Sequence, residues 1–459
     1  MLSKLLQPEI QSLIAEKKLS ILKEIVSDWS PADIAEMIVD LEPRDQVILF
    51  RILSSDLATD TFEHLELDTQ KELLKAMGRT EVAAILNDMS PDDRTALLEE
   101  LPGTAAKQLI QLLSTEERKI AQTLLGYPEN SVGRLMTPDY AAIKPEWKIE
   151  DTMKYIRENA EDKETLNIVY VIDEKGKLID DIKIREFILA SPEGHISDLM
   201  DRTFVALNVN DDQEYAVEVF KKYYRIAIPV VDTHGVLIGI VTVDDVLDVA
   251  EEEATEDIQK IGGVEALEES YSRIPVFNLL KKRAGWLGLL FIGEMLTATA
   301  MGFFENEISK AIVLTLFIPL IISSGGNSGS QAATLVIRAL SLGEITLRDW
   351  YFVMRREIIS GFVLGGFLAV IGFLRIAVWE YAFHVYGTHW ILIAITVALA
   401  LVGVVLWGTL SGSMLPILLK KAGLDPATSS APLVATMVDV IGLIIYFTVA
   451  MLILRGTLL

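Results

Sequence analysis

Hydrophobic and polar positions are arranged in two different ways along the chain, and the pattern changes near residue 280. Before that point, short apolar stripes alternate with charged positions, as in helices and strands that are half buried. After it come five apolar runs, each near the roughly 20 residues that a helix needs to cross a bilayer. These runs cover 284–304, 311–340, 358–379, 390–419 and 432–454. The pattern predicts a polar region followed by an α-helical membrane domain with five transmembrane helices.

Residues 1–128 are predicted to form an all-α N-terminal solenoid. The segment SPADIAEMIVDL at 30–41 recurs as SPDDRTALLEEL at 90–101. Each copy begins with a serine suited to cap a helix and a proline suited to its first turn, followed by an apolar stripe at helical spacing. Short helices separated by Pro, Gly or Asp fill this part of the chain.

A second repeat occupies 129–250 and predicts an α/β pair. Each copy runs helix, strand, turn, strand, helix, and glycine-containing turns at 171–178 and 230–237 join the β-branched runs. The pattern resembles a tandem pair of CBS domains. That resemblance implies an adenine nucleotide such as ATP, with Asp244 or Asp245 on the ribose. The first copy departs from this ending at 180–186, so a second nucleotide site is not expected.

Asp439 lies in the middle of the last apolar run, with no Lys or Arg between residues 422 and 454. An ionised carboxylate at bilayer depth costs at least ~2.5 to 3.5 kcal/mol, so it usually faces a water-filled path or a partner. The alternative is a structural Asp that is hydrogen-bonded to a neighbouring helix. Glu294 and Arg375 are further charges within the predicted spans. A lone acid in a pore favours a cation.

The second span carries small and polar residues at bilayer depth, SSGGNSGSQ at 323–331. Glycines there permit either close helix contact or a broken helix that faces a cavity. Close packing explains the glycines, but it explains Asn327 and Gln331 less well.

The distribution of charge gives the topology and excludes some partners. Of 65 acidic residues, 56 lie in residues 1–273, with 29 of the 41 bases, a formal charge of −27. Such a field disfavours nucleic acid and anionic lipid surfaces. Basic residues cluster before span 1, between spans 2 and 3, and between spans 4 and 5, which places those loops and the N-terminal region in the cytoplasm and the C-terminus outside. There is no cysteine, and residues 1–8 lack the apolar core of a signal peptide, so the polar region is expected to stay in the cytoplasm.

Taken together, these parts resemble the MgtE magnesium channel family over nearly the full length. The most specific segments are GGNSGSQAAT at 325–334, DPA at 425–427, PLVATMVDVIGL at 432–443 and DDVLDVAEEEATEDI at 244–258. The resemblance implies a homodimer in the cell inner membrane, with a connecting (plug) helix at 251–275 and a pore domain at 276–459. It implies that Asp439 from both subunits forms the ion-selecting ring, with Asn327 and the backbone at Ala435 lining the pore.

The resemblance also implies that cytosolic Mg²⁺ closes the channel by bridging acidic surfaces. The implied acids are Asp60, Asp92, Glu214, Asp245, Asp248, Glu252, Glu253, Glu256, Asp257 and Asp425. Ala96 and Tyr224 stand where the family can place an acid, which implies fewer bridging ions or a need for more Mg²⁺. Like charges crowded on one helix repel, and a divalent cation would favour a compact state.

Two other functions remain open on the sequence. A secondary transporter that exchanges a divalent cation for Na⁺ or H⁺ would also use Glu294, Asp439 and Arg375. A membrane enzyme regulated by nucleotide is disfavoured, because no nucleophile–base constellation or phosphate-binding Gly loop is present and the five histidines have no metal-ligand spacing. The chain is therefore expected not to be an enzyme, and its expected partners are Mg²⁺, membrane lipid and a second copy.

Overall fold

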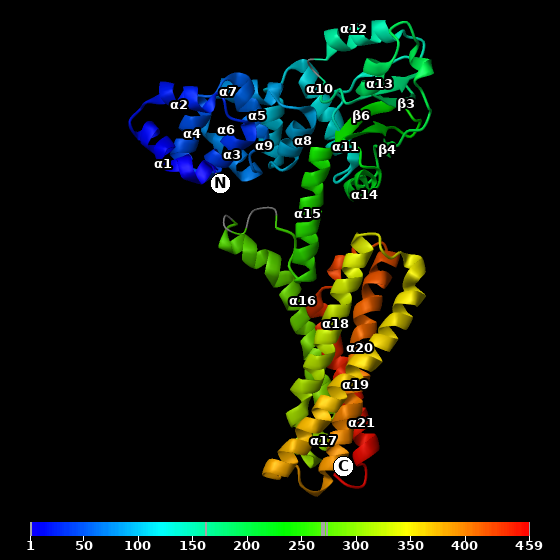
Figure 1. Ribbon diagram of the computed structural model, residues 1–459. Helices are drawn as coiled ribbons and strands as arrows, with labels where there is room; N and C mark the ends of the chain where they lie inside the picture. Colours follow the sequence, from blue (N-terminus) through cyan, green and yellow to red (C-terminus); the bar gives the residue numbers. More distant parts are fainter. Residues whose placement is uncertain (1, 161–162, 268–270, 272–273, 459) are drawn as a thin grey trace. The chain divides into compact units, whose positions relative to one another are not determined.

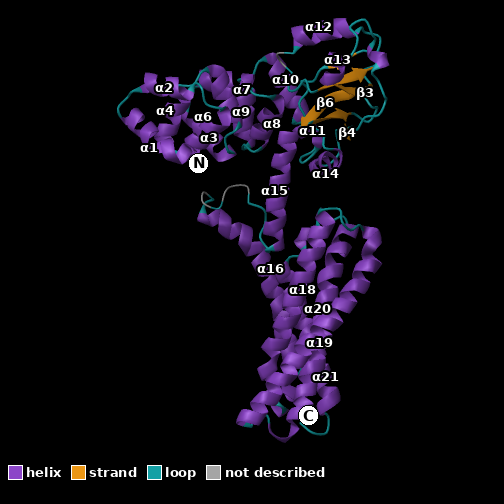
Figure 2. Ribbon diagram, in the orientation of Figure 1, coloured by secondary structure: helices purple, strands orange, loops and turns teal. Residues whose placement is uncertain are grey.

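The computed structural model describes residues 2–160, 163–267, 271 and 274–458. The chain forms two compact units, Met1–Glu251 and Glu252–Leu459. Helix and strand content follows the predicted order, with helices first, two small sheets next, and long helices last (Figure 2). The predicted fold class is confirmed. The finer domain limits at 128, 250 and 275 stay predictions, and part of the expected 251–275 segment lies outside the described residues.

The first part of unit 1 is built from short helices, in which each helix of the series α1, α3, α5 and α7 packs on the next (Figure 1, blue to cyan). α1 contacts α3, α3 contacts α5, and α5 contacts α7, around a single apolar core that runs from Ile10 to Ala121. The bounds are α1 Leu2–Ala15, α2 Leu19–Val26, α3 Pro31–Asp40, α4 Pro43–Arg51, α5 Ser55–Glu63, α6 Leu67–Ala76, α7 Arg79–Asp88, α8 Pro91–Glu99, α9 Gly103–Ile110, α10 Thr115–Leu124 and α11 Val132–Leu135.

The repeated serine caps differ between the two copies. Ser30 accepts a hydrogen bond from the Asp33 backbone N–H at 3.2 Å, as predicted. Ser90 makes no such cap, and its hydroxyl donates to the Asp93 carboxylate at 2.8 Å. The predicted cap at Ser90 is wrong in this respect, although both serine hydroxyls donate to the acid at the third helical position, Ser30 to Asp33 at 2.7 Å.

The two α/β repeats each form a three-stranded sheet. In each, a short strand pairs in parallel with the first strand of an antiparallel hairpin. Gly176 and Gly235 turn the hairpins with positive φ of 79° and 81°, the conformation for which glycine is suited. The elements are β1 Ala142–Ile143, α12 Ile149–Asn159, β2 Ile168–Ile172, β3 Leu178–Lys183, α13 Ile184–Leu189, η1 Ile196–Asp198, β4 Leu207–Asn208, α14 Gln213–Tyr223, β5 Ala227–Val231, β6 Leu237–Thr242 and α15 Val243–Ile261.

Unit 2 contains five helices that are long and apolar enough to cross a membrane, at Val276–Phe303, Ile312–Ser341, Leu347–Phe383, Gly387–Lys421 and Ala431–Leu454. Its elements are α16 Val276–Phe303, α17 Glu305–Lys310, η2 Ile312–Phe317, α18 Ile318–Ser341, η3 Leu347–Asp349, α19 Trp350–Phe383, η4 Gly387–His389, α20 Trp390–Lys421, η5 Pro426–Thr428 and α21 Ala431–Leu454. α18, α20 and α21 pack together as the centre of this bundle. α16 buries only Thr297 within the chain.

The glycine-rich stretch of α18 is continuous helix, so the broken-helix alternative does not hold for this structure. Gly325 and Gly329 face Gly408 and Gly412 of α20 so closely that a Cβ on Gly408 or Gly412 would overlap the carbonyl oxygen of Gly325 or Gly329. Small residues four apart let two helix backbones approach in a membrane. Packing therefore explains the glycines of the second span.

Candidate ion-binding sites

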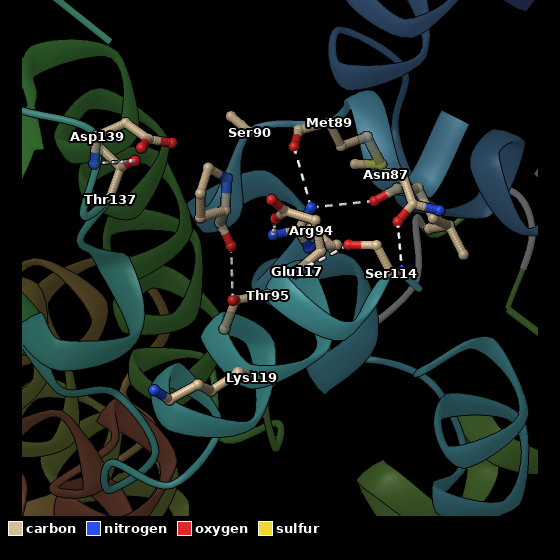
Figure 3. A network of polar contacts seen from close by, with 12 residues as sticks. Asn87, Met89, Ser90, Arg94, Thr95, Ser114, Glu117, Lys119, Thr137 and Asp139 are labelled. Carbon is tan, nitrogen blue, oxygen red and sulfur yellow. Dashed lines mark hydrogen bonds and ion pairs between the residues drawn. The ribbon is translucent and has the colours of Figure 1, made fainter. Parts of the chain in front are cut away.

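Helix α8 presents Asp92 and Asp93 on a frame that a buried arginine holds in place. The Arg94 side chain is fully buried and donates to the backbone carbonyls of Leu86 at 3.1 Å and Met89 at 3.2 Å. It also forms an ion pair with Glu117 of α10 (Figure 3). Because Arg94 ties the first turn of α8 to α7 and α10, the two preceding carboxylates have a fixed position.

Asp92 lies at the centre of an acidic cluster within unit 1. Its side chain is buried, and its carboxylate is close enough to Asp245, at the start of α15, for the two charges to interact. Asp93 interacts in the same way with Asp244 and Asp248. Glu63 of α5 and Glu164 of the first α/β repeat complete the cluster, which we call the acid cluster. It joins residues from the helical region and from both repeats.

Burial and mutual repulsion raise the pKa of several of these acids. Loss of solvent raises the pKa of Glu63 to about 7, against the lowering effect of the Ser90 backbone N–H, which donates to Glu63 at 2.8 Å. Desolvation and the neighbouring Asp93 raise the pKa of Asp92 to about 7. At the solvent-accessible rim, desolvation and the charges of Asp92 and Asp244 raise the pKa of Glu164 to about 8. These groups bind a proton, or a cation, more readily than isolated carboxylates.

Asp245 and Asp248 of α15, two of the acids that the family resemblance implies, belong to the acid cluster. Asp245 accepts a hydrogen bond from Thr242, yet burial and Asp92 still raise its pKa well above the usual value. Burial and the charge of Asp244 raise the pKa of Asp248. Asp244 itself is exposed.

The other expected acids of unit 1 are more peripheral. Asp60 is exposed one turn before Glu63 and adds to the negative potential at that side chain. Glu214 is exposed in the first turn of α14, where the Asp212 carboxylate caps the helix. Ala96 is exposed on α8, and Tyr224 is exposed in a left-handed conformation at the end of α14, with φ of 50°.

The second half of α15 docks on a loop of unit 2. Lys260 forms ion pairs with Glu256 on its own helix and with Asp425, whose carboxylate lies 2.7 Å from the ammonium. Burial opposes the charged form of Lys260, but its hydrogen bonds to the two acids outweigh that effect and raise its pKa. Asp257 accepts a hydrogen bond from Ser341 at 3.0 Å, and desolvation raises its pKa. Glu252 and Glu253 lie on the same helix, exposed and partly buried respectively.

The pore residues expected from the sequence lie on two adjacent helices. Asp439 is half-buried on α21, and Ala435 is one turn earlier on the same helix. A Cβ built on Gly326 of α18 would lie 3.6 Å from the Cβ of Ala435, which places Asn327 at the same crossing. Asp439 interacts directly with the carboxyl group of Glu294 on α16.

A polar stripe follows the outer face of α18. Ser323, Asn327, Gln331 and Thr334 recur at helical spacing and are all exposed, although this helix is long and apolar enough to cross a membrane. Asn327 donates only a long hydrogen bond of 3.5 Å to Ser323. Amide groups cannot be left facing hydrocarbon without a cost of several kcal/mol, at roughly 2–7 for each. The stripe therefore faces water or a second protein surface.

Among the described residues, no three His, Asp or Glu side chains lie together in a ready-made arrangement for a metal ion. Mg²⁺ keeps several of its waters when it binds proteins and needs only one or two carboxylates.

Five residues at these sites were not predicted from the sequence: Glu63, Asp93, Glu164, Lys260 and Ser341. Glu63 could have been found from its position one turn after Asp60. Glu164 has no such signal, because it joins the cluster only through tertiary packing.

Comparisons with known proteins show the family of the chain. Family models match the divalent cation transporter domain of MgtE at 318–449, the MgtE intracellular N domain at 29–130 and CBS domains at 132–193 and 196–252. The chain is 34% identical over 450 residues to the magnesium transporter MgtE of Thermus thermophilus, covering 97% of this chain and 98% of that protein. It is 30% identical to the magnesium transporter MgtE of Bacillus subtilis, covering 95% of each.

Two solved structures resemble unit 1. One is the cytosolic domain of the Mg²⁺ channel MgtE in complex with ATP, at 30% identity and a TM-score of 0.51, covering 53% of this chain and 99% of that one. The other is the soluble part of a magnesium transporter, at 27% identity and a TM-score of 0.52, covering 55% and 99%. The near-complete match in sequence means that this chain belongs to the MgtE family of divalent cation transporters.

Proposed function

We propose that the protein is a homodimeric, Mg²⁺-selective channel for magnesium uptake, with unit 1 in the cytoplasm and the C-terminus outside the inner membrane. The observation that carries this proposal is Asp439, a carboxylate on the part of α21 that packs against α18, the helix with the polar stripe, in a bundle whose helices are long and apolar enough to cross a membrane. The family membership supports Mg²⁺ as the ion, since the relatives that match over the full length are magnesium transporters.

A second copy of the chain would provide the protein surface that the polar stripe of α18 faces. Two copies that meet along α18 and α21 would turn Ser323, Asn327 and Gln331 towards a shared axis and place two Asp439 carboxylates across it. A ring of charge −2 attracts a divalent cation, and the carboxylates can bind it through its water shell.

Closure by cytosolic Mg²⁺ is the regulation that the acids support. The acid cluster of unit 1 and the Glu256, Asp257 and Asp425 group of unit 2 both gather carboxylates around the two ends of α15. Bound Mg²⁺ would favour the state in which these surfaces are close, and by linkage that state binds Mg²⁺ more tightly.

The CBS pair is proposed to bind ATP, as a relative's cytosolic domain does. Asp244 is the better candidate for the ribose hydroxyls, because its carboxylate is exposed, whereas Asp245 is held by Thr242 and faces Asp92. Calorimetry of the full chain in detergent, with and without Mg²⁺, tests this part. An absence of heat at high ATP would leave the CBS pair as a platform for dimerisation.

An exchanger is the second candidate, and the carboxyl pair of Asp439 and Glu294 favours it, since paired carboxyls can carry a proton. Recordings from planar bilayers separate the two functions. Single-channel currents that are independent of the Na⁺ and H⁺ gradients support the channel, and uptake driven by either gradient supports the exchanger.

Asp439→Asn should abolish Mg²⁺ flux and leave the protein folded. Normal Mg²⁺ flux in that variant would remove Asp439 from the ion path.

A further inference from the structure

Glu294 is a carboxylate within the first membrane helix whose neighbours are unusual. It is exposed on α16, within the 28-residue apolar span Val276–Phe303. Its carboxyl group interacts with that of Asp439 on α21. The preceding residue sets the approach of the two helices. A Cβ on Gly293 would lie only 2.8 Å from Cγ2 of Thr436, so the backbone of α16 lies close to α21 at this level.

The pair has no cationic partner within the part of the chain that the structure describes. No lysine or arginine forms an ion pair with Glu294 or Asp439 there. Two carboxylates in contact repel, and the repulsion grows as the surroundings become less polar. A positive charge from outside the protein is the simplest way to relieve it.

A buried hydroxyl one turn further along α16 points to the same conclusion. Thr297 is 7% exposed, and its Oγ1 has no hydrogen-bond partner. It lies three residues after Glu294, hence on the same face of the helix. Buried hydroxyls are normally paired, because an unpaired one costs about 1–3 kcal/mol. Here the unpaired oxygen lies on the same face of α16 as Glu294, where a water of a bound ion would supply the missing hydrogen bond.

We infer that Glu294 is a second ion-contacting carboxylate of the pore, which acts with Asp439 and, through a water molecule, with Thr297. The inference rests on the proposed channel function and deepens it by naming a residue that sets selectivity. In a dimer, four carboxylates would line one level of the path. Since the attraction of an ion to fixed charge scales with the charge of the ion, the second carboxylate favours hydrated Mg²⁺ over K⁺ and Na⁺.

The test is the Mg²⁺-to-K⁺ permeability ratio of the full-length protein, measured from reversal potentials in planar bilayers. Glu294→Gln keeps the shape and removes the charge, and it should lower this ratio about tenfold or more. Glu294→Asp, which retains the charge, should keep most of the Mg²⁺-to-K⁺ permeability ratio. Glu305→Gln is the matched control, because Glu305 is an exposed acid of the same unit outside the span and should leave the ratio unchanged.

The possible outcomes separate the inference from the function on which it rests. Channel currents in the unmodified protein, with an unchanged ratio in Glu294→Gln, overturn the role of Glu294 alone. No currents from the unmodified protein overturn the channel itself. If Glu294→Gln does not fold, Thr297→Val provides the second measurement. A lowered ratio in that variant supports the inference, and an unchanged ratio rejects it.

Discussion

The Lys260 ammonium lies 2.7 Å from the Asp425 carboxylate and also pairs with Glu256, so a lysine of the chain itself stands among acids that we assign to regulatory Mg²⁺. A tethered monovalent cation in that position has two effects. It links α15 to the loop before α21 without Mg²⁺, and it competes with Mg²⁺ for the same oxygens. Both effects are modest, since Lys260 is partly exposed and such pairs contribute about 0–1 kcal/mol.

Lys260→Gln should therefore loosen α15 in the absence of Mg²⁺ and tighten the binding of Mg²⁺. In chelator, we expect proteolysis near residues 251–261 to be faster in the Lys260→Gln variant than in the unmodified protein. The Mg²⁺ concentration that gives half protection should fall, by up to about fivefold for a contribution of ~1 kcal/mol. Lys421→Gln, at an exposed lysine of the same unit, is the control. An unchanged midpoint in Lys260→Gln would show that the lysine does not compete with Mg²⁺.

Neutralising the acids of α15 should remove Mg²⁺ sensing. In the unmodified protein, Mg²⁺ in the millimolar range should protect 251–261 from protease, because bridging ions offset the repulsion between carboxylates. The variant with Asp245, Asp248, Glu253 and Asp257 changed to their amides should lose this protection and stay open at high internal Mg²⁺. Asp211→Asn and Asp349→Asn, which remove acids elsewhere in the two units, should behave as the unmodified protein. Full protection in the fourfold variant would falsify the sensor.

Unit 1 should become less stable as pH rises when no divalent cation is present. Glu63 and Asp92 have folded-state pKa values of about 7, above their ordinary values of 4.5 and 3.8. A raised folded pKa means that the folded state holds the proton while the unfolded state releases it. The resulting stability is fully present below about pH 4 and is lost as pH rises to about 7.

The melting temperature of the full chain in chelator tests whether stability falls as pH rises. It should fall by a few degrees between pH 5 and pH 7.5, since each kcal/mol is worth about 2–4 °C in a unit of this size. Mg²⁺ should restore most of the loss at pH 7.5. The double variant Glu63→Gln, Asp92→Asn should show a clearly smaller dependence, with the remainder due to Glu164 and Asp245, and Glu100→Gln, at the exposed end of α8, should retain it in full. A melting temperature that rises with pH in chelator would contradict the assignment.

How much of the molecule could be predicted depends on how local each feature is. The helical region, the two hairpins with glycine turns and the five spans follow from spacing and turn chemistry, which act within a few residues. Asp439 was recognisable because a charge within an apolar run is a local anomaly. The acid run at 244–257 is helical in the structure, where it lies within α15.

The features that were missed depend on tertiary contact. Glu164 joins Asp92 only because the first α/β repeat packs beside α8, and no pattern near Glu164 indicates this. Lys260 is an ordinary basic residue until Asp425, 165 positions later, lies against it. The sequence showed Glu294 as a charge within a span but could not show that Asp439 was its neighbour.

The contact between α18 and α20 provides a test of the packing of the membrane unit. A methyl group on Gly412 would overlap the carbonyl oxygen of Gly329, and both backbones are held by their own helices, so neither can give way easily. Gly412→Ala should separate the two helices and destabilise the fold by about 1–3 kcal/mol, the usual cost of overpacking.

Gly366→Ala is the matched control, because a Cβ on this residue of α19 meets no other atom within 4 Å. Thermal melting of the detergent-solubilised protein should show a clear loss for Gly412→Ala and little change for Gly366→Ala, which gains from the better helix propensity of alanine. Equal melting temperatures for the two variants would mean that α18 and α20 are not packed as closely as the structure has them, and the glycines of the second span would then need another explanation.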